Sequence, residues 1–328
     1  MRYLLGSLIF TTMFLAGCEQ KVEQSVIGVN LGIPNQPSSA LLHIALDQGY
    51  FTEAGLNVTP HYYPSGKRAL LDGYVSGEID YLSTADAPFV LKVSTEMPEL
   101  KVLASIYTTD NLNRIVARKD AGISSLVDLK GKRVATQSNS AVHYFLHSVI
   151  EEQQLDHNDL AVSFMPADQL PLALAGGQID AFSMREPYVT QARKLIGDES
   201  VAVLASPGTY VQSELLIARD TIHARQPEVA ERMLSALIKA ERFALDDAAA
   251  AIAVVSKALK TSPDAIAVNW QGFDYAVRLN QALLSQLERM SQWIVLEVDD
   301  KAVPPNFLNS IDSAPLTKVA PSAVSLVR

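Results

Sequence analysis

The chain has 328 residues, 48% of them hydrophobic, with a formal net charge of −9 and one cysteine. This length is enough for two domains of ordinary size with a large core. The acidic balance argues against nucleic-acid binding, which needs a basic patch. A single cysteine excludes a disulfide framework and a cysteine-based metal site.

The N-terminus has the form of an export signal. Arg2 precedes a mostly apolar run at residues 3–14, which is too short to span a bilayer. The run ends in Leu15-Ala16-Gly17-Cys18, which resembles a bacterial lipobox. We therefore predict a lipoprotein signal peptide at 1–17, lipidation of Cys18 and a polar tether at 18–25. The alternative is an ordinary secretory signal with an incidental cysteine. The rest of the chain is expected to be a soluble domain held at an extracytoplasmic membrane face.

Strands and helices alternate along the first third of the chain. The apolar patterns predict strands at 26–31, 57–63, 79–83 and 101–106, and helices at 40–48 and from residue 88. Such alternation predicts mostly parallel strands with right-handed crossovers, the α/β class. Residues 107–113 are polar and lack periodicity, so we place a crossing to a second lobe there.

The pattern then restarts. We expect strands at 114–118, 133–136, 161–165 and 179–183, a helix at 141–153, and a strand at 210–218 that returns to the first lobe. Helices are expected at 227–257 and 280–293. The predicted division is therefore lobe 1 at 26–110 and 220–312, lobe 2 at 111–219, and a weakly ordered tail at 313–328.

One segment occurs twice, 100 residues apart. Gly77-Glu78-Ile79-Asp80 is followed by a strand, a polar loop and Pro88, and Gly177-Gln178-Ile179-Asp180 is followed by the same features and Pro187. The repeat predicts two similar α/β halves. Each would present the C-terminal end of a strand and a helix N-terminus, where open α/β sheets bind ligands. Two such edges facing each other would form a cleft.

Four loops between strands and helices are expected to line this cleft, at 34–39, 84–87, 137–140 and 184–186. Helix N-termini carry a partial charge of about +0.5, which suits sulfonate, nitrate, carboxylate or phosphate. Helix capping is the alternative role of the Ser and Asn residues. The candidate ligand-binding residues are Asn35, Gln36, Ser39, Thr84, Ala85, Asp86, Gln137, Ser138, Asn139, Ser140, His143, Met184, Arg185, Glu186 and, as a wall, Tyr210.

Charged residues in these loops have two interpretations each. Asp86 and Glu186 hold matching positions in the repeat, and each could cap its own helix or accept a hydrogen bond from a ligand amine. Arg185 is the only basic residue of the four loops and could pair with an anionic ligand or with one of these carboxylates. His143 and His147 share a helix face, but no third ligand is evident, so no metal is predicted.

Several stretches together resemble substrate-binding proteins of ABC transporters, in the group that takes up nitrate, sulfonates, taurine and thiamine-related pyrimidines. They are the Asp47-Gln48-Gly49-Tyr50-Phe51 region, the two repeats, Asp128-Leu129-Lys130-Gly131-Lys132 and Glu186-Pro187-Tyr188. The resemblance implies a type II periplasmic-binding-protein fold, with ligand held between two lobes and delivered to a membrane permease. It places cleft residues at 83–86, 138–143 and 184–186. Gln137 and Arg185 depart from the group's usual pattern, which has a small residue and a bulky apolar residue there.

The working hypothesis is a lipid-anchored, monomeric solute-binding protein that closes on a small sulfonate or an amine-bearing relative such as taurine. Alternatives are a binding protein for nitrate, bicarbonate or a thiamine-precursor pyrimidine, or a sensory ligand-binder without a permease. Stacking aromatics, which a pyrimidine needs, are absent from the four loops. An enzyme on the same fold is not expected. The pyrimidine synthases of this type rely on a cysteine-rich motif, which a chain with a single cysteine cannot contain. No cofactor is expected.

Overall fold

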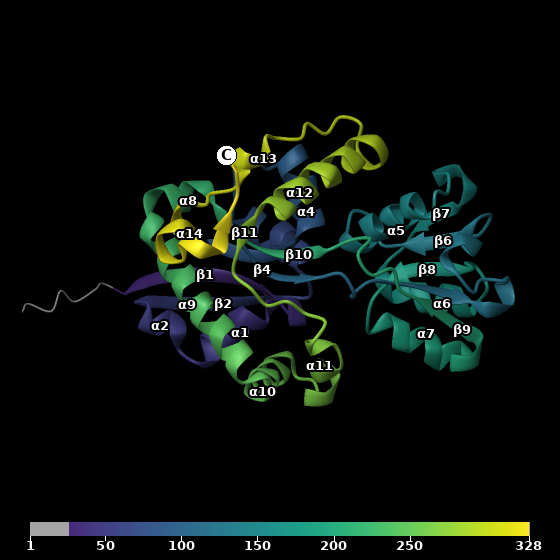
Figure 1. Ribbon diagram of the computed structural model, residues 1–328, viewed down its shortest axis with the longest axis horizontal. Coiled ribbons are helices and arrows are strands. Elements are labelled where there is room, and N and C mark those ends of the chain that lie inside the picture. The colour runs from purple at the N-terminus through teal and green to yellow at the C-terminus, as the bar shows by residue number, and fades with distance from the viewer. Residues whose placement is uncertain (1–25, 328) are drawn as a thin grey trace, which may run out of the picture.

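A computed structural model describes residues 26–327 as two lobes, each a five-stranded sheet flanked by helices (Figure 1). The lobe at the left of Figure 1 contains both the purple N-terminal strands and the yellow C-terminal helices. The predicted signal peptide at 1–17, Cys18 and the tether at 18–25 lie outside the described residues. Within those residues, no helix has the length and apolarity needed to cross a bilayer.

The first sheet has the order β2-β1-β3-β10-β4. Its strands are β1 (Ile27–Pro34), β2 (Leu56–Tyr63), β3 (Tyr81–Ala85), β4 (Leu100–Thr109) and β10 (Gln212–Arg219). Strands β2, β1 and β3 are parallel, while β10 runs antiparallel to both of its neighbours. The helices of this lobe are α1 (Ala40–Asp47), α2 (Tyr50–Glu53), α3 (Gly66–Arg68), α4 (Asp86–Thr95), α8 (Asp220–Arg225), α9 (Pro227–Asp246), α10 (Ala248–Leu259), α11 (Pro263–Trp270), α12 (Gln281–Trp293) and α13 (Phe307–Ser310).

The second sheet repeats this layout in the order β7-β6-β8-β5-β9. Its strands are β5 (Arg114–Arg118), β6 (Arg133–Thr136), β7 (Ala161–Phe164), β8 (Ala181–Met184) and β9 (Val201–Leu204), and its helices are α5 (Ala141–Glu152), α6 (Leu170–Ala175) and α7 (Tyr188–Ile196). Here β5 is antiparallel to both neighbours. In each lobe, the antiparallel strand is therefore the one that directly follows a crossing of the chain.

The duplicated sequence forms equivalent parts of the two sheets. Strands β3 and β8 each hold the third place in their sheet. The Oδ2 atom of Asp80 accepts a hydrogen bond from the Asn30 backbone N–H at 2.8 Å, and Oδ2 of Asp180 accepts one from the Arg133 N–H at 2.9 Å. Each carboxylate thus fastens the incoming strand to its parallel neighbour. The repeated motif is structural.

Strand β10 and the helices after it differ in part from expectation. The expected lobe boundary at residue 219 places residues 212–219 in lobe 2, but β10 pairs with β3 and β4 in the first sheet. The reason is burial, because Leu215, Leu216 and Ile217 are fully buried between the helix layers. The chain crosses between lobes at 110–113 and 205–211. The expected helix at 227–257 is two helices, separated at Asp247, whose side chain caps α10.

The prediction of a weakly ordered tail at 313–328 is wrong for its described part. Residues Ala314–Val319 form helix α14, which packs on α9, and the Leu316 side chain is completely buried. Strand β12 (Val324–Ser325) then pairs with β11 (Leu279–Asn280). The C-terminal segment is therefore part of the first lobe's core.

Candidate functional site

Three adjoining cavities lie in the cleft between the lobes. The inner cavity has a volume of about 40 Å³, the middle cavity about 140 Å³ and the outer cavity about 470 Å³. Gln36, Arg185 and Gln212 line both the inner and the middle cavity. Leu112 and Glu186 line both the middle and the outer cavity. The middle cavity therefore adjoins both of the others.

Helix N-termini from both lobes meet at the inner cavity. The N-cap residues Ser65 of α3, Ala85 of α4 and Ser140 of α5 all line it. Ser65 Oγ accepts a hydrogen bond from the Arg68 N–H at 3.3 Å. At α4 the Asp86 carboxylate accepts a hydrogen bond from the Ala87 N–H, whereas the side chain of Ser140 caps no N–H of α5. Unpaired N–H groups at such ends favour an anion between them.

Two cationic side chains reinforce this positive end. Arg185 follows strand β8 and is half-buried. Burial lowers its pKa, while the nearby Glu214 favours its charged form. Among residues 26–327 its guanidinium makes no hydrogen bond or ion pair. Lys67 Nζ reaches across the cleft and donates to the Ser138 carbonyl oxygen at 3.2 Å. Burial lowers the pKa of Lys67 as well.

A buried carboxyl group faces these cations. Glu214 on β10 lines the inner cavity, is only 2% exposed, and its Oε1 atom has no hydrogen-bond partner. Burial raises its pKa from 4.5 to about 7, although the hydroxyls of Ser83 and Ser38 and the charge of Arg185 oppose the rise. Glu214 and Arg185 attract each other, but no N···O distance between them is as short as the 4.0 Å of an ion pair. The inner cavity therefore offers separate positions for an anionic and a cationic group.

The middle cavity is mainly apolar. The rings of Tyr107 and Phe273 pack edge to face at its wall, with centroids 5.1 Å apart. Pro37, Leu112 and Ile266 contribute further apolar surface. An uncharged portion of a solute would pack here.

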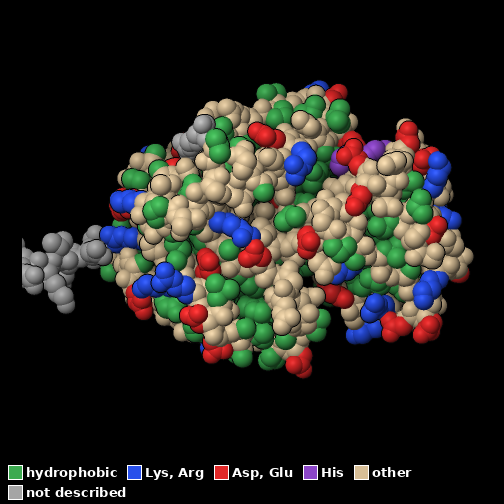
Figure 2. Space-filling model, in the orientation of Figure 1, with side chains coloured by type: hydrophobic (Ala, Val, Ile, Leu, Met, Phe, Trp, Pro, Cys, Tyr) green, Lys and Arg blue, Asp and Glu red, His purple; other side chains and the backbone are tan. Residues whose placement is uncertain are grey.

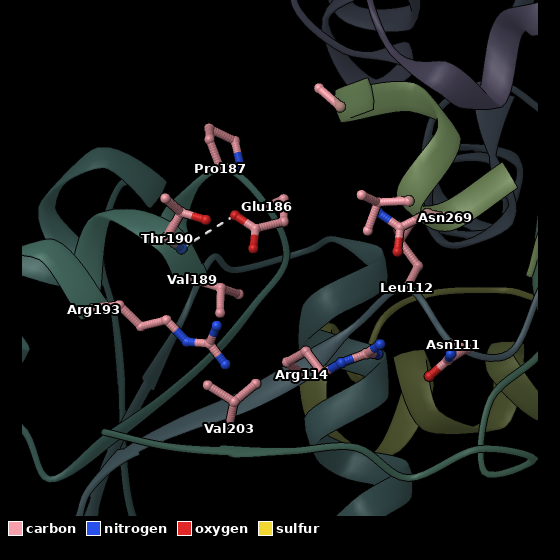
Figure 3. A pocket seen from close by; sticks show the side chains of 12 residues that line it. Asn111, Leu112, Arg114, Glu186, Pro187, Val189, Thr190, Arg193, Val203 and Asn269 are labelled. Atoms are coloured by element: carbon pink, nitrogen blue, oxygen red, sulfur yellow. Dashed lines mark hydrogen bonds between the residues drawn. The ribbon is translucent and has the colours of Figure 1, made fainter. Parts of the chain in front are cut away.

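The outer cavity contains Glu186, and Figure 3 shows its carboxylate turned toward the start of α7. Glu186 Oε2 accepts a hydrogen bond from the Thr190 backbone N–H at 3.1 Å. Of the two interpretations offered by the sequence, helix capping is therefore the one seen here. Arg114 and Arg193 also line this cavity (Figure 3).

Six of the expected ligand-binding residues line the cleft cavities, namely Gln36, Ala85, Gln137, Ser140, Arg185 and Glu186. Six others do not line them, namely Asn35, Ser39, Thr84, Ser138, Asn139 and Met184. Asn35 is exposed, and the side chains of Ser39, Thr84 and Met184 are buried in the lobes. Ser138 contributes only its backbone carbonyl, to Lys67.

Asp86 and Tyr210 lie behind the cavity wall, which corrects their expected roles. The Asp86 side chain is completely buried and accepts hydrogen bonds from the Tyr210 hydroxyl, the Gln286 amide, and the backbone N–H groups of Ser213 at 2.9 Å and Ala87 at 2.8 Å. Burial raises its pKa to about 6 despite these donors. With every acceptor position occupied, Asp86 joins α4, β10 and α12 and has no room for a ligand amine.

His143 also lies away from the cleft cavities. Its ring packs edge to face on Phe164 and Trp293, with centroids 4.7 and 4.9 Å away. Burial lowers its pKa to about 4. The Asn139 N–H donates to its Nδ1 at 3.4 Å. His143 is therefore a packed, neutral side chain between the lobes.

Sequence reasoning missed Lys67, Glu214 and Phe273. The loop before Lys67 has the same strand–loop–helix pattern as the four loops that were selected, so a signal was present. Glu214 lies in the largely apolar strand β10. A single carboxylate within a buried strand could have marked it as a functional residue. Phe273 follows α11 and reaches the cleft from the C-terminal helices. Nothing local marks it as a cleft residue.

The sequence also matches a family model and several known proteins. A family model described as "NMT1/THI5 like" matches residues 36–251, about two thirds of the chain. A Bacillus subtilis (strain 168) protein named "Putative aliphatic sulfonates-binding protein" is 25% identical over 259 residues, covering 74% of this chain and 75% of that protein.

Two solved structures share the two-lobed fold. The alkanesulfonate-binding protein SsuA from Xanthomonas axonopodis pv. citri bound to MOPS superposes with a TM-score of 0.72 at 17% identity, covering 89% of this chain and 100% of that one. The desulfurization enzyme DszB superposes with a TM-score of 0.65 at 16% identity, covering 90% and 99%. The predicted periplasmic-binding-protein fold is confirmed, and the fold alone does not separate binding from catalysis.

Proposed function

Since the chain belongs to the NMT1/THI5-like family, we propose that it is the solute-binding component of an ABC uptake system. Its solute is a small sulfonate, either purely anionic or zwitterionic like taurine. The protein is held at an extracytoplasmic membrane face through Cys18, acts as a monomer and hands its solute to the permease subunits.

One observation supports this proposal above the others. The half-buried Arg185 guanidinium lies at the junction of the inner and middle cavities and makes no hydrogen bond or ion pair among residues 26–327. A partly desolvated guanidinium without a partner is costly, and a bidentate sulfonate would satisfy it. Lys67 and the N-termini of α3 and α5 add positive potential at the same point.

Glu214 favours a solute that also carries an amine. Its unpartnered Oε1 would accept a hydrogen bond from an ammonium group, and the ammonium would lower the raised pKa of this carboxyl group. Tyr107 and Phe273 would cover the solute's carbon atoms. The sulfonate-binding relatives named above support the same class of ligand.

Closure of the two lobes is the proposed mechanism. Arg185 belongs to one lobe, whereas Lys67 and Glu214 belong to the other, so a solute contacting all three binds the closed state better than the open one. That difference in affinity shifts the population toward closure. The two crossing segments at 110–113 and 205–211 would absorb the rotation.

A thiamine-precursor pyrimidine is the second candidate, and the Tyr107–Phe273 pair favours it. Both aromatic residues lie outside the four loops at 34–39, 84–87, 137–140 and 184–186, which contain no stacking aromatics. A catalytic role based on a cysteine nucleophile is not supported, because Cys18, the only cysteine, precedes the described domain.

Thermal unfolding of the full-length protein in mild detergent tests the proposal, with taurine, ethanesulfonate, nitrate, bicarbonate and formylaminopyrimidine as additives. A true ligand raises the midpoint in a concentration-dependent way. We expect the largest rise from taurine or ethanesulfonate. A rise with formylaminopyrimidine alone would establish the second candidate and overturn the first.

Arg185→Gln provides the residue-level test. Removing a charge-assisted contact should weaken sulfonate binding about 10- to 100-fold, measured by calorimetry. The matched control is Arg193→Gln in the outer cavity, where Arg193 is ion-paired with Asp198 at 3.6 Å. Equal sulfonate affinity in wild type and Arg185→Gln would remove Arg185 from the site.

A further inference from the structure

A cluster of two histidines and one glutamate lies between the lobes, outside the cleft cavities. Figure 2 shows histidine and acidic side chains side by side at the upper edge of the boundary between the lobes. His147 is on α5, and His157 is in the short helical turn His157–Asp159, both in lobe 2. Glu297 comes from lobe 1, in the π-helical turn Ile294–Val298 that continues α12. The chain brings these groups together from positions 140 residues apart.

The two imidazoles approach the same carboxylate oxygen. His147 Nδ1 lies 2.9 Å and His157 Nε2 lies 3.1 Å from the same oxygen, Glu297 Oε1. The two imidazole rings are stacked, with centroids 4.9 Å apart. Both nitrogens are buried, and neither has a hydrogen bond of good geometry. The two imidazole nitrogens point at one carboxylate oxygen but form no well-aligned hydrogen bond with it. Each nitrogen can therefore still coordinate a metal ion.

We propose that His147 Nδ1, His157 Nε2 and Glu297 Oε1 bind a divalent transition-metal ion of the zinc class. Two imidazoles and one carboxylate are a common zinc ligand set, and tetrahedral bonds of about 2.0–2.1 Å place the ligand atoms about 3.3 Å apart. The observed spacings from Glu297 Oε1 are close to that value. The remaining position is open to an adjoining cavity of about 240 Å³, from which water can enter.

Glu151 supports this arrangement. Its Oε2 lies 3.7 Å from His147 Nε2, the ring nitrogen that faces away from Glu297. A carboxylate on that side favours the tautomer with hydrogen on Nε2, which leaves the Nδ1 lone pair for the metal. The ligand atoms offered by His147, Glu151 and His157 also lie within 4.8 Å of one another. Negative charge therefore surrounds the ion on two sides.

The location of the site gives it a mechanical role. Two ligands belong to lobe 2 and the third to lobe 1, so the ion would connect the lobes only in the closed arrangement. An ion bound more tightly by the closed state shifts the population toward that state.

The experiment uses the full-length protein without a histidine tag, in mild detergent, after dialysis against EDTA. Saturating Zn²⁺, at about 100 times its dissociation constant, should raise the unfolding midpoint by roughly 5 °C. Co²⁺ should give the intense visible absorption of a tetrahedral complex. Both effects should disappear in His157→Asn and in Glu297→Gln, which is nearly isosteric and is expected to fold.

Glu78→Gln is the matched control. Glu78 pairs with His61 in lobe 1, at 3.2 Å between Oε1 and Nδ1, but no second histidine joins them. This variant should keep the full Zn²⁺ response. The proposal is overturned if Zn²⁺ leaves the wild-type midpoint unchanged, if Co²⁺ gives only octahedral absorption, or if Glu297→Gln responds like wild type.

Discussion

The buried carboxyl group of Glu214 makes the stability of this protein depend on pH in a defined direction. In the folded state the pKa is about 7, against 4.5 for the free side chain. Between these values the native state holds a proton that the unfolded chain has released. Stability contributed by Glu214 is therefore complete below pH 4.5 and is lost as pH rises through about 7. The shift corresponds to about 3 kcal/mol in the free energy of unfolding.

Glu214→Gln should remove this contribution, because the amide does not ionise. Urea unfolding at intervals from about pH 4 to about pH 8 gives the free energy of unfolding of each protein. Over this range, the variant should gain about 3 kcal/mol relative to wild type. Contributions of groups that do not interact with Glu214 cancel in the difference, whereas Asp86, whose charge raises the pKa of Glu214, cancels only in part.

Two further measurements make the test of Glu214 specific. Taurine should flatten the wild-type pH dependence more than ethanesulfonate does, because only taurine brings an ammonium group to the carboxylate. Glu53→Gln removes an exposed carboxylate that pairs with Lys239 at 2.6 Å and serves as the control. A constant difference between Glu214→Gln and wild type across the pH range would refute the reasoning.

Two other predictions concern the framework, both measured by urea unfolding. Asp86→Ala leaves buried donors from three elements unpaired and should cost about 4 kcal/mol, whereas Asp72→Ala, at an exposed ion pair, should cost under about 1 kcal/mol. Similar losses in the two variants would contradict the role given to Asp86. Leu316→Ala should cost about 3 kcal/mol because it opens a cavity in the core, and the exposed Val327→Ala should have almost no effect. A loss below about 0.5 kcal/mol at Leu316 would mean that the C-terminal segment is not part of the core.

Local patterns predicted much of the fold. The repeat correctly predicted two similar sheets. Its glycine adopts a positive φ in the turn, its isoleucine is buried just before the strand, and its aspartate fastens that strand to its neighbour. All three residues are requirements of one turn and of the strand that follows it. The glycines illustrate this, with φ values of 77° at Gly77 and 67° at Gly177. Of the residues chosen from loops between a strand and a helix, Arg185, Gln36 and Ser140 line the cleft cavities, and their contact with a ligand stays a prediction.

Long-range pairing decided what the sequence did not reveal. Glu214 reaches the inner cavity because β10 inserts between β3 and β4, and strand insertion has no local signature. Asp86 looked available to a ligand because its partners, Tyr210, Ser213 and Gln286, lie more than 120 residues away along the chain. The composition of the C-terminal segment predicted weak order. Leu316 is buried because helix α14 packs on α9, which lies far away in the sequence.

The two strand-fastening aspartates have a consequence for how such a protein can change. Asp180 fastens β8 to its sheet from the N-terminal side of the strand, whereas Arg185 follows the other end and makes no side-chain hydrogen bond or ion pair among residues 26–327. The segment after β3 differs, because Asp86 there is buried and joins three elements of the framework. Loop residues such as Arg185 can therefore be exchanged while the sheets persist. A lineage built on this framework can acquire new solutes by altering a few loop positions, with the lobes themselves inherited intact.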